Sequence, residues 1–157
     1  MTRPAEGAPA PAFTLATDTG ETVSLADFAG RTVVLYFYPK DDTPGCTTES
    51  CQFRDLFPRF ARDKAVILGI SPDSVKSHAK FKKKYDLPFT LLADEGHAVA
   101  DAYGVWALKT FMGRKYMGVE RTTFIIGPDG RVARVFEKVK PDGHADEVMV
   151  ALRDLAK

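Results

Sequence analysis

The sequence predicts an α/β fold in which a mixed central sheet is flanked by helices, with a β-hairpin near the N-terminus. Three observations lead to this prediction. Apolar runs of strand length alternate with segments of helical periodicity over most of the chain. A strong antiparallel hairpin signal follows, and then an amphipathic helical segment. A length of 157 residues fits one domain, so we expect a single domain over residues 1–157.

The N-terminal part of the chain contains the first strands and the first helix. Residues 13–16 and 22–25 alternate apolar and polar side chains around a turn, which predicts a short β-hairpin. Residues 33–38 form an apolar run rich in β-branched and aromatic side chains, typical of a strand buried on both faces. After a loop with three turn signals, residues 46–62 carry large apolar side chains at helical spacing. We expect residues 1–11, rich in proline and alanine, to form an extended lead-in.

The same alternation continues in the middle of the chain. Residues 65–70 predict a second buried strand, and residues 74–85 predict a helix with a basic face and a serine N-cap. Residues 89–92 predict a third strand, and residues 97–103 a further helix. We expect residues 105–120 to form a long loop with a functional or covering role.

The C-terminal elements complete the predicted sheet. Residues 122–126 and 131–136 flank a Gly-Pro-Asp-Gly turn, which predicts an antiparallel hairpin. Residues 145–155 predict an amphipathic helix. For this order of elements a thioredoxin-like fold is the natural candidate. Such a fold hosts many functions, so the chemistry must be argued from particular residues.

Composition and charge exclude several functional classes. The chain has 22 basic and 21 acidic residues, a formal net charge of +1, which does not favour a nucleic-acid surface or a polybasic membrane patch. It has no run of 18 apolar residues, so we expect no membrane contact. The first residues lack the apolar core of a secretory signal, which makes the cytoplasm the expected location.

The two cysteines, Cys46 and Cys51, are the most informative residues. In a reducing compartment a close pair is more often redox-active or metal-binding than structural. Metal binding is disfavoured because the pair lacks the C-x₂-C spacing and because His78, His97 and His144 are scattered along the chain. We expect these histidines to be solvated or to cap helices, and we expect neither a metal nor a cofactor.

Cys46 occupies a favourable position for nucleophilic chemistry. It lies where the loop after a buried strand turns into a helix, and ligands concentrate at that edge of an open α/β sheet. In the first helical turn its sulfur faces unpaired backbone N–H groups and the positive end of the helix dipole, and both favour the thiolate. A fast reaction of such a thiolate also needs groups that stabilise the charge developing on the atoms it attacks.

Two further side chains are candidates for that stabilisation. Thr43 lies three residues before Cys46, and its hydroxyl can both donate to a thiolate and accept a hydrogen bond from a bound substrate. Arg121 leads into a buried strand, and its guanidinium offers several donors in a rigid fork. Residue spacing alone does not place Arg121 near Cys46.

The chain resembles the peroxiredoxins. Pro39, Thr43 and Cys46 match the Pro-x-x-x-Thr-x-x-Cys motif of that family. A second cysteine five residues on, Cys51, is similar to the bacterioferritin-comigratory-protein or peroxiredoxin Q branch. The segment that opens with Arg121 matches the Arg-x-Thr/Ser-Phe segment of the same branch. The resemblance spans nearly the whole chain.

The resemblance implies a thioredoxin-like fold and a thiol peroxidase acting on hydrogen peroxide and alkyl hydroperoxides. Cys46 would attack the peroxide, and Cys51 would resolve the resulting sulfenic acid. Thr43 and Arg121 would complete the site, and Pro39 would shield the thiolate from water. Thioredoxin or a similar dithiol would be the reductant, and we expect a monomer.

Formation of a disulfide between Cys46 and Cys51 requires a change in the helix that carries them. Two residues five apart on one helix have Cα atoms about 8–9 Å apart. A disulfide needs less than about 7 Å. We therefore expect the start of the helix, residues 46–53, to unwind before Cys51 attacks Cys46. Glu49, one turn after Cys46, is expected to orient an arginine.

Several alternatives stay open at this point. Cys51 can be an inert helical cysteine, which would leave a one-cysteine cycle. The chain can be a thioredoxin-like disulfide reductase, although it lacks the C-x-x-C motif, or a non-catalytic redox sensor that reacts no faster than free cysteine. Trp106, Phe111 and Met112 either form an apolar collar over the active site or pack the surrounding loop.

Overall fold

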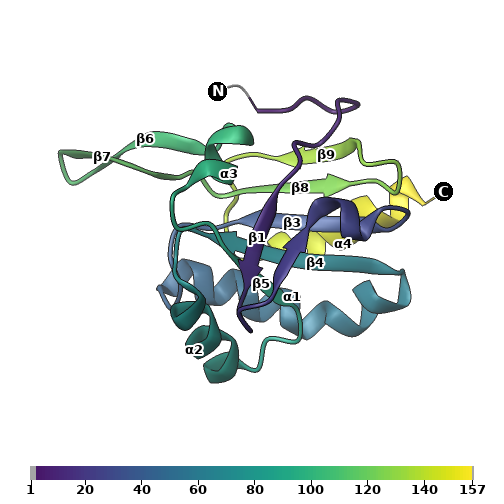
Figure 1. The fold of residues 1–157 in the computed structure, drawn as a ribbon, viewed down its shortest axis with the longest axis horizontal. Helices are drawn as coiled ribbons and strands as arrows, with labels where there is room; N and C mark the ends of the chain where they lie inside the picture. Colours follow the sequence, from purple (N-terminus) through teal and green to yellow (C-terminus); the bar gives the residue numbers. More distant parts are fainter. Residues whose placement is uncertain (1–2, 157) are drawn as a thin grey trace.

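A seven-stranded mixed sheet forms the centre of the molecule, and helices cover both of its faces (Figure 1). The structure is a computed structural model that describes residues 3–156. Its strand order is β2-β1-β5-β4-β3-β8-β9, which confirms the predicted thioredoxin-like arrangement with its N-terminal hairpin. The elements are β1 (Thr14–Thr17), β2 (Thr22–Ser24), η1 (Leu25–Phe28), β3 (Thr32–Phe37), α1 (Pro44–Arg62), β4 (Ala65–Ser71), α2 (Val75–Tyr85), β5 (Thr90–Ala93), α3 (Ala98–Ala102), β6 (Trp106–Phe111), β7 (Arg114–Val119), β8 (Thr122–Ile126), β9 (Val132–Phe136) and α4 (His144–Leu155).

Strand β3 lies inside the sheet, between β4 and β8, and its side chains are buried on both faces. It pairs with β4 in parallel and with β8 in antiparallel orientation. Successive side chains of a strand point to opposite faces, so Tyr36 packs into one core and Leu35 and Phe37 into the other. Loops that follow the carboxyl ends of β3 and β4 therefore meet at one edge of the sheet, which is where Cys46 lies.

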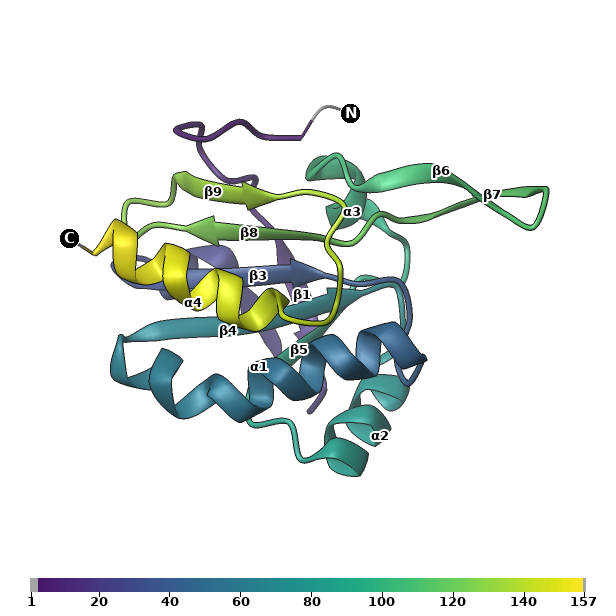
Figure 2. The same cartoon turned by 180° about the vertical axis from the view of Figure 1, so that it is seen from behind.

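The two hydrophobic cores are covered by different elements. Helices α1 and α4 pack on one face and contribute Phe53, Phe60 and Val148 to its core (Figure 2). The N-terminal segment, η1 and α3 cover the other face, where Phe13 and Tyr103 pack against β3 and β8. Among residues 3–156, no helix has the length and apolar character needed to cross a membrane.

The expected long loop at residues 105–120 is wrong, because these residues form the antiparallel hairpin β6–β7. Met112 and Gly113 make its turn, and both have positive φ, 51° and 80°. A two-residue turn of this kind usually carries Asn-Gly or Asp-Gly, so methionine at the first position hid the signal. The hairpin projects from the body of the molecule (Figure 1).

The other predicted elements agree with the structure within two residues at each end, and the short helix η1 was not predicted. Helix α1 begins at Pro44 rather than at Cys46, since proline is well suited to the first helical turn. Ser74 is the N-cap of α2, as predicted, and its hydroxyl accepts a hydrogen bond from the backbone N–H of Ser77. The lead-in is tied to the sheet by an isolated bridge between Pro9 and Arg131.

Candidate active site

The first turn of helix α1 positions Cys46 at the carboxyl edge of the sheet. Thr43 is the N-cap residue, Pro44 opens the helix, and Cys46 is the third helical residue. The backbone N–H groups of such a turn have no partner within the helix, so they face the region around the sulfur. Cys46 is buried, with 1% of its surface exposed, and it belongs to the core beneath α1.

Arg121 reaches Cys46 from a different part of the chain. It lies between β7 and β8, and its Nη2 donates a hydrogen bond to Cys46 Sγ at 3.3 Å. Its Nη1 donates to Glu49 Oε1 at 2.7 Å. A Cβ on Gly45 would lie only 3.1 Å from Arg121 Nη2, so glycine leaves the room that the guanidinium needs. The site thus holds a cation against the sulfur, in a fixed orientation.

Glu49 fixes the guanidinium at a cost in desolvation. Its side chain is fully buried, and its Oε2 has no hydrogen-bond partner among the described residues. Burial raises the pKa of Glu49 from 4.5 to about 7, although the charge and hydrogen bond of Arg121 act in the opposite direction. The expectation that Glu49 orients an arginine agrees with this geometry.

The raised pKa of Glu49 predicts a pH-dependent free energy of unfolding. Between about 4.5 and 7 the folded protein keeps a proton that the unfolded chain has released, so stability falls as the pH rises. The loss should reach about 3 kcal/mol above neutral pH. Urea unfolding of the wild type and Glu49→Gln, from about pH 4 to pH 8, measures it. The slope should be smaller in the variant by the Glu49 contribution, while the contribution of His78 remains in both proteins. An equal slope in both proteins would assign all of it to other groups.

Cys51 lies on α1 one and a half turns after Cys46 and is partly exposed. Burial raises the pKa of its thiol above the ordinary value, with Arg54 acting to lower it. Cys51 is therefore a poor nucleophile while the helix is intact, because the thiolate is the reactive form. Both cysteines are free thiols here, so the structure represents the reduced protein.

Thr43 and Pro39 lie in the segment that leads into α1, and the hydrogen bond of the Thr43 hydroxyl differs from the expectation. The Thr43 hydroxyl donates to the backbone carbonyl of Lys40 at 2.9 Å. Because the hydroxyl proton of Thr43 is already donated to this carbonyl, it is not donated to the thiolate. The hydroxyl oxygen can still accept a hydrogen bond from a peroxide. Pro39 lies two residues after the end of β3 and is half-buried.

The expectation for the histidines is wrong for two of them. His78 and His144 are buried, and each ring is hydrogen-bonded through both nitrogens. Burial lowers the pKa of His144, which contacts Thr123 and Glu147. His97 alone is part-exposed. These positions follow from tertiary packing, which brings partners 14 to 37 residues away to the rings of His78 and His144.

The hairpin β6–β7 adds one charged residue that the sequence did not single out. Lys109 is half-buried and donates to the Val119 carbonyl. Burial lowers its pKa, and the charge of Arg121 adds to this effect. No residue pattern pointed to Lys109, since the segment was expected to be a loop.

The proposed apolar collar is not supported for two of its three residues. Phe111 and Met112 are at the hairpin tip, with 66% and 87% of their surfaces exposed. Trp106 instead packs at the hairpin base, where its ring stacks on His97 at 4.0 Å between centroids.

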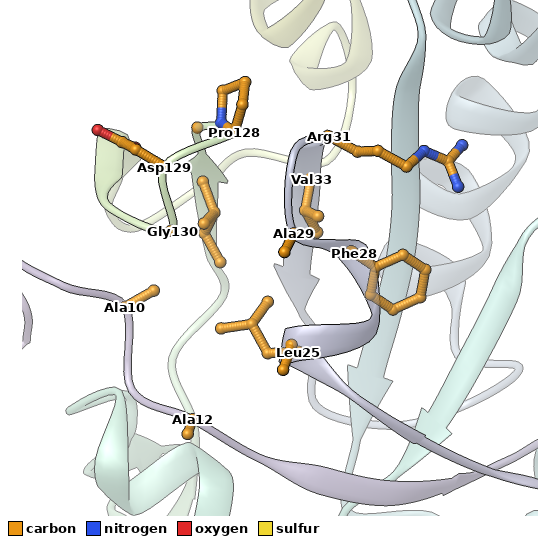
Figure 3. A pocket seen from close by; sticks show the side chains of 13 residues that line it. Ala10, Ala12, Leu25, Phe28, Ala29, Arg31, Val33, Pro128, Asp129 and Gly130 are labelled. Carbon is orange, nitrogen blue, oxygen red and sulfur yellow. The ribbon is translucent and has the colours of Figure 1, made fainter.

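An apolar hollow lies at the opposite end of β3 (Figure 3). Its volume is about 250 Å³, and Leu25, Phe28 and Val33 line it. Arg31 and Asp129 are the charged residues among those that line it. Val33 lies at the start of β3, whereas Cys46 lies beyond its end. The length of β3 therefore separates this hollow from the cysteine site.

A cysteine at the start of a helix that follows a buried strand, hydrogen-bonded to an arginine that pairs with a glutamate, limits the protein families to which the chain can belong. Comparison with known proteins decides which family this is. The AhpC/TSA family model matches residues 7–135. The chain belongs to this family of peroxiredoxins. It is accordingly an enzyme, a thiol-dependent peroxidase.

Peroxiredoxins similar to this one are found in several bacteria. A putative peroxiredoxin Bcp of Coxiella burnetii is 55% identical over 143 residues, 91% of this chain and 95% of its own length. Peroxiredoxin Bcp of Bacillus subtilis is 51% identical over 96% of each chain. The solved bacterioferritin comigratory protein of Xanthomonas campestris, described for its alkyl peroxide reduction activity, superimposes with a TM-score of 0.88. It is 43% identical and covers 92% of each chain.

Proposed function

We propose that this peroxiredoxin reduces hydrogen peroxide and alkyl hydroperoxides with Cys46 as the peroxidatic residue and Cys51 as the resolving residue. The observation that carries the proposal is the hydrogen bond from Arg121 Nη2 to Cys46 Sγ, 3.3 Å long, at the start of α1. A guanidinium in that position favours the thiolate and leaves further donor capacity for the peroxide oxygens.

The reaction divides into two steps. The Cys46 thiolate attacks the nearer peroxide oxygen, the O–O bond breaks, and the leaving alkoxide or hydroxide takes a proton to become an alcohol or water. Cys46 is thereby oxidised to a sulfenic acid. The Cys51 thiolate then attacks the sulfenic sulfur, water leaves, and a disulfide forms. A dithiol reduces this disulfide by exchange and regenerates both thiols.

Each of the other site residues has a role in this proposal. Arg121 stabilises the thiolate and the charge that develops on the peroxide. Thr43 accepts from the peroxide proton, because its own proton is held by the Lys40 carbonyl. Pro39 limits the access of water, and Glu49 holds the guanidinium in its orientation.

The test of this function is the time course of thiol loss after one equivalent of hydrogen peroxide is added to the reduced protein. Free cysteine is treated in parallel as the control. We expect both thiols to disappear orders of magnitude faster than the control, with an intramolecular disulfide in the intact mass. Loss at the control rate would contradict the peroxidase assignment, and fast loss of one thiol would remove Cys51 from the cycle.

The disulfide requires the first two turns of α1 to unwind. Unwinding over residues 46–53 breaks the buried Tyr36–Ser50 hydrogen bond of 2.8 Å and removes Phe53 from its stack on Tyr36. It also breaks the bonds that join Gln52 to the loop before α4. These contacts favour the helical form in the reduced protein, and the covalent bond offsets their loss in the oxidised protein.

Hydrogen exchange measures this change directly. Amides of residues 46–53 are expected to lose at least about tenfold in protection on oxidation, whereas those of α4 should change little. The Cys51→Ser variant is the control, since peroxide oxidises its Cys46 without closing a disulfide. Equal protection of residues 46–53 in the reduced and disulfide forms would rule out the unwinding.

The remaining aspects of the proposal concern partners and location. Thioredoxin or a similar dithiol is the proposed reductant, because a disulfide next to an unwound, accessible segment can be attacked by an external thiolate. We propose that residues 1–157 act as one domain and as a monomer. The cytoplasm is the proposed compartment, since both cysteines must be returned to thiols between turnovers.

A further inference from the structure

A second buried cluster lies next to the active site and has no role in the chemistry described so far. At its centre is Asp41, which belongs to the loop between β3 and α1 and whose side chain is 3% exposed. Its carboxylate accepts three hydrogen bonds. Tyr38 Oη donates to Oδ1 at 2.6 Å, and Ser77 Oγ and His78 Nδ1 lie 2.8 and 2.7 Å from Oδ2.

The contacts of His78 show how many protons the cluster holds. Its Nε2 lies 2.8 Å from the backbone carbonyl oxygen of Leu92, which can only accept, so Nε2 carries a proton. Its Nδ1 faces the Asp41 carboxylate, which also accepts. Both ring nitrogens therefore donate, and His78 is an imidazolium paired with a carboxylate.

The same groups resemble a metal site, but their hydrogen bonds argue against one. Asp41, Asp73 and His78 offer three potential ligand atoms within 4.8 Å of one another. However, the Asp41 oxygens already accept from three donors, and Asp73 Oδ2 accepts from Ser71 Oγ and from the Asp41 backbone N–H. A cation would have to displace these donors and also deprotonate His78.

The cluster connects three elements to the loop that leads into the active site. Asp41 is bonded through its side chain to α2 and through its backbone to Asp73, which precedes α2. His78 extends the connection to β5 through Leu92. Thr43 lies two residues after Asp41, and the next residue opens α1. The loop is thus attached to the sheet and to α2 at a point close to the reacting sulfur.

We propose that the Asp41–His78 ion pair positions the loop before helix α1, and that it thereby holds the Thr43 hydroxyl in place for the bound peroxide. The inference rests on the proposed function, because it concerns the geometry of peroxide attack at Cys46. Asp41 and His78 are positioning residues, since neither is bonded to the sulfur. Unwinding of α1 leaves this anchor in place, so the loop stays attached while the helix opens.

The ion pair also makes the positioning depend on pH. The titratable groups that face His78 are Tyr38, the residue after β3, Asp41 from the loop, and Asp73 before α2. Burial acts to lower the pKa of His78, but its hydrogen bond to Asp41 and the Asp41 charge raise that pKa above its ordinary value. The Asp41–His78 ion pair is intact below the raised pKa of His78. It is lost as the pH rises through that pKa, because the deprotonated Nδ1 and the Asp41 carboxylate are then both acceptors.

Two rate constants, measured on the same thiol, test the proposal. In a Cys51→Ser background, which isolates Cys46, we compare reaction with hydrogen peroxide and with iodoacetamide. Alkylation needs only an accessible thiolate, whereas peroxide attack also needs aligned donors and acceptors. We expect Asp41→Ala to slow the peroxide reaction about 30- to 100-fold while alkylation changes less than about threefold.

Conservative and control variants separate positioning from charge. Asp41→Asn can accept from Tyr38 and donate to His78, so it should recover most of the peroxide rate. In the parent protein we expect the ratio of the peroxide rate to the iodoacetamide rate to decline at alkaline pH, and Asp41→Asn should abolish this decline. Asp42→Asn is the matched control, because Asp42 is exposed, pairs with Lys84 and has a left-handed φ of 57° that asparagine tolerates.

The outcomes distinguish the inference from the proposed function. Equal peroxide rates in Asp41→Ala and the parent would overturn the inference, and so would a parallel fall of both rate constants. If Asp41→Ala does not fold, Ser77→Ala removes one donor from the same carboxylate and should lower the ratio about threefold; an unchanged ratio there would equally overturn it. A parent protein that reacts with peroxide no faster than free cysteine would instead reject the proposed function.

Discussion

The Cys46→Ser variant is expected to lose peroxidase activity by at least about a thousandfold, because a serine hydroxyl stays protonated where a thiol ionises. Cys46 is the thiol that contacts the Arg121 guanidinium, at 3.3 Å, and it occupies the first turn of α1. Serine is nearly isosteric, so the fold should be retained. Peroxide consumption with thioredoxin and its reductase as the electron source measures the loss.

The Cys51→Ser variant is the matched control for this prediction. It should keep the fast first oxidation of Cys46 and lose only the disulfide and the turnover that depends on it. Since Cys51 has a raised pKa and lies away from the guanidinium, it cannot replace Cys46 as the attacking thiol. Substantial peroxide reactivity in Cys46→Ser, or its loss in Cys51→Ser, would reverse the two assignments.

The Arg121→Ala variant is expected to slow oxidation of Cys46 by about 100- to 1,000-fold, the usual effect of removing one donor that stabilises developing charge. Arg121→Lys keeps the charge but loses the fork that reaches Cys46 and Glu49 together, so we expect an intermediate rate. The second-order rate constant with hydrogen peroxide, measured by stopped flow, gives both values. Arg114→Ala, on the exposed part of the hairpin, should react at the wild-type rate.

In Arg121→Ala, a loss of folding stability must be distinguished from a slower oxidation of Cys46. Without Arg121, the buried Glu49 carboxylate has no partner, and its pKa should rise beyond about 7. The double variant Arg121→Ala/Glu49→Gln removes that unpaired charge and should recover stability without recovering the rate. If the double variant also regains the rate of Cys46 oxidation, the guanidinium affects that rate only by stabilising the folded protein. An unchanged rate in Arg121→Ala would exclude it from the site altogether.

These predictions share a physical basis in the placement of charge near a buried sulfur. The guanidinium contacts both Cys46 and Glu49, so the site holds one cation between two groups that can be anionic. Glu49, whose pKa is close to neutral, adjusts the net charge of this group within the physiological range. The Asp41–His78 pair adds a balanced ion pair on the other side of the loop, without adding net charge.

Local patterns in the sequence were enough to predict most of the fold and to choose Cys46 as the proposed nucleophile. The apolar run at residues 33–38, the Gly-Pro-Asp-Gly turn and the helical spacing after Cys46 each depend on neighbours in the chain. Strand period, turn chemistry and helix period are local properties, so they could be recognised without coordinates. The hairpin β6–β7 was missed because methionine stands in a turn position that usually carries asparagine or aspartate.

Tertiary structure alone decided the contacts between segments that are distant in the chain. Arg121 and Cys46 are 75 residues apart, and Asp41 and His78 are 37 apart. No local period encodes such pairs, because they depend on which strands become neighbours in the sheet and on the loops at its edge. The sequence by itself was enough to predict Cys46 as the proposed nucleophile and to place it at the start of a helix. The folded sheet determined which charges surround that sulfur, because only closure of the chain brings β8 and α2 to the loop before α1.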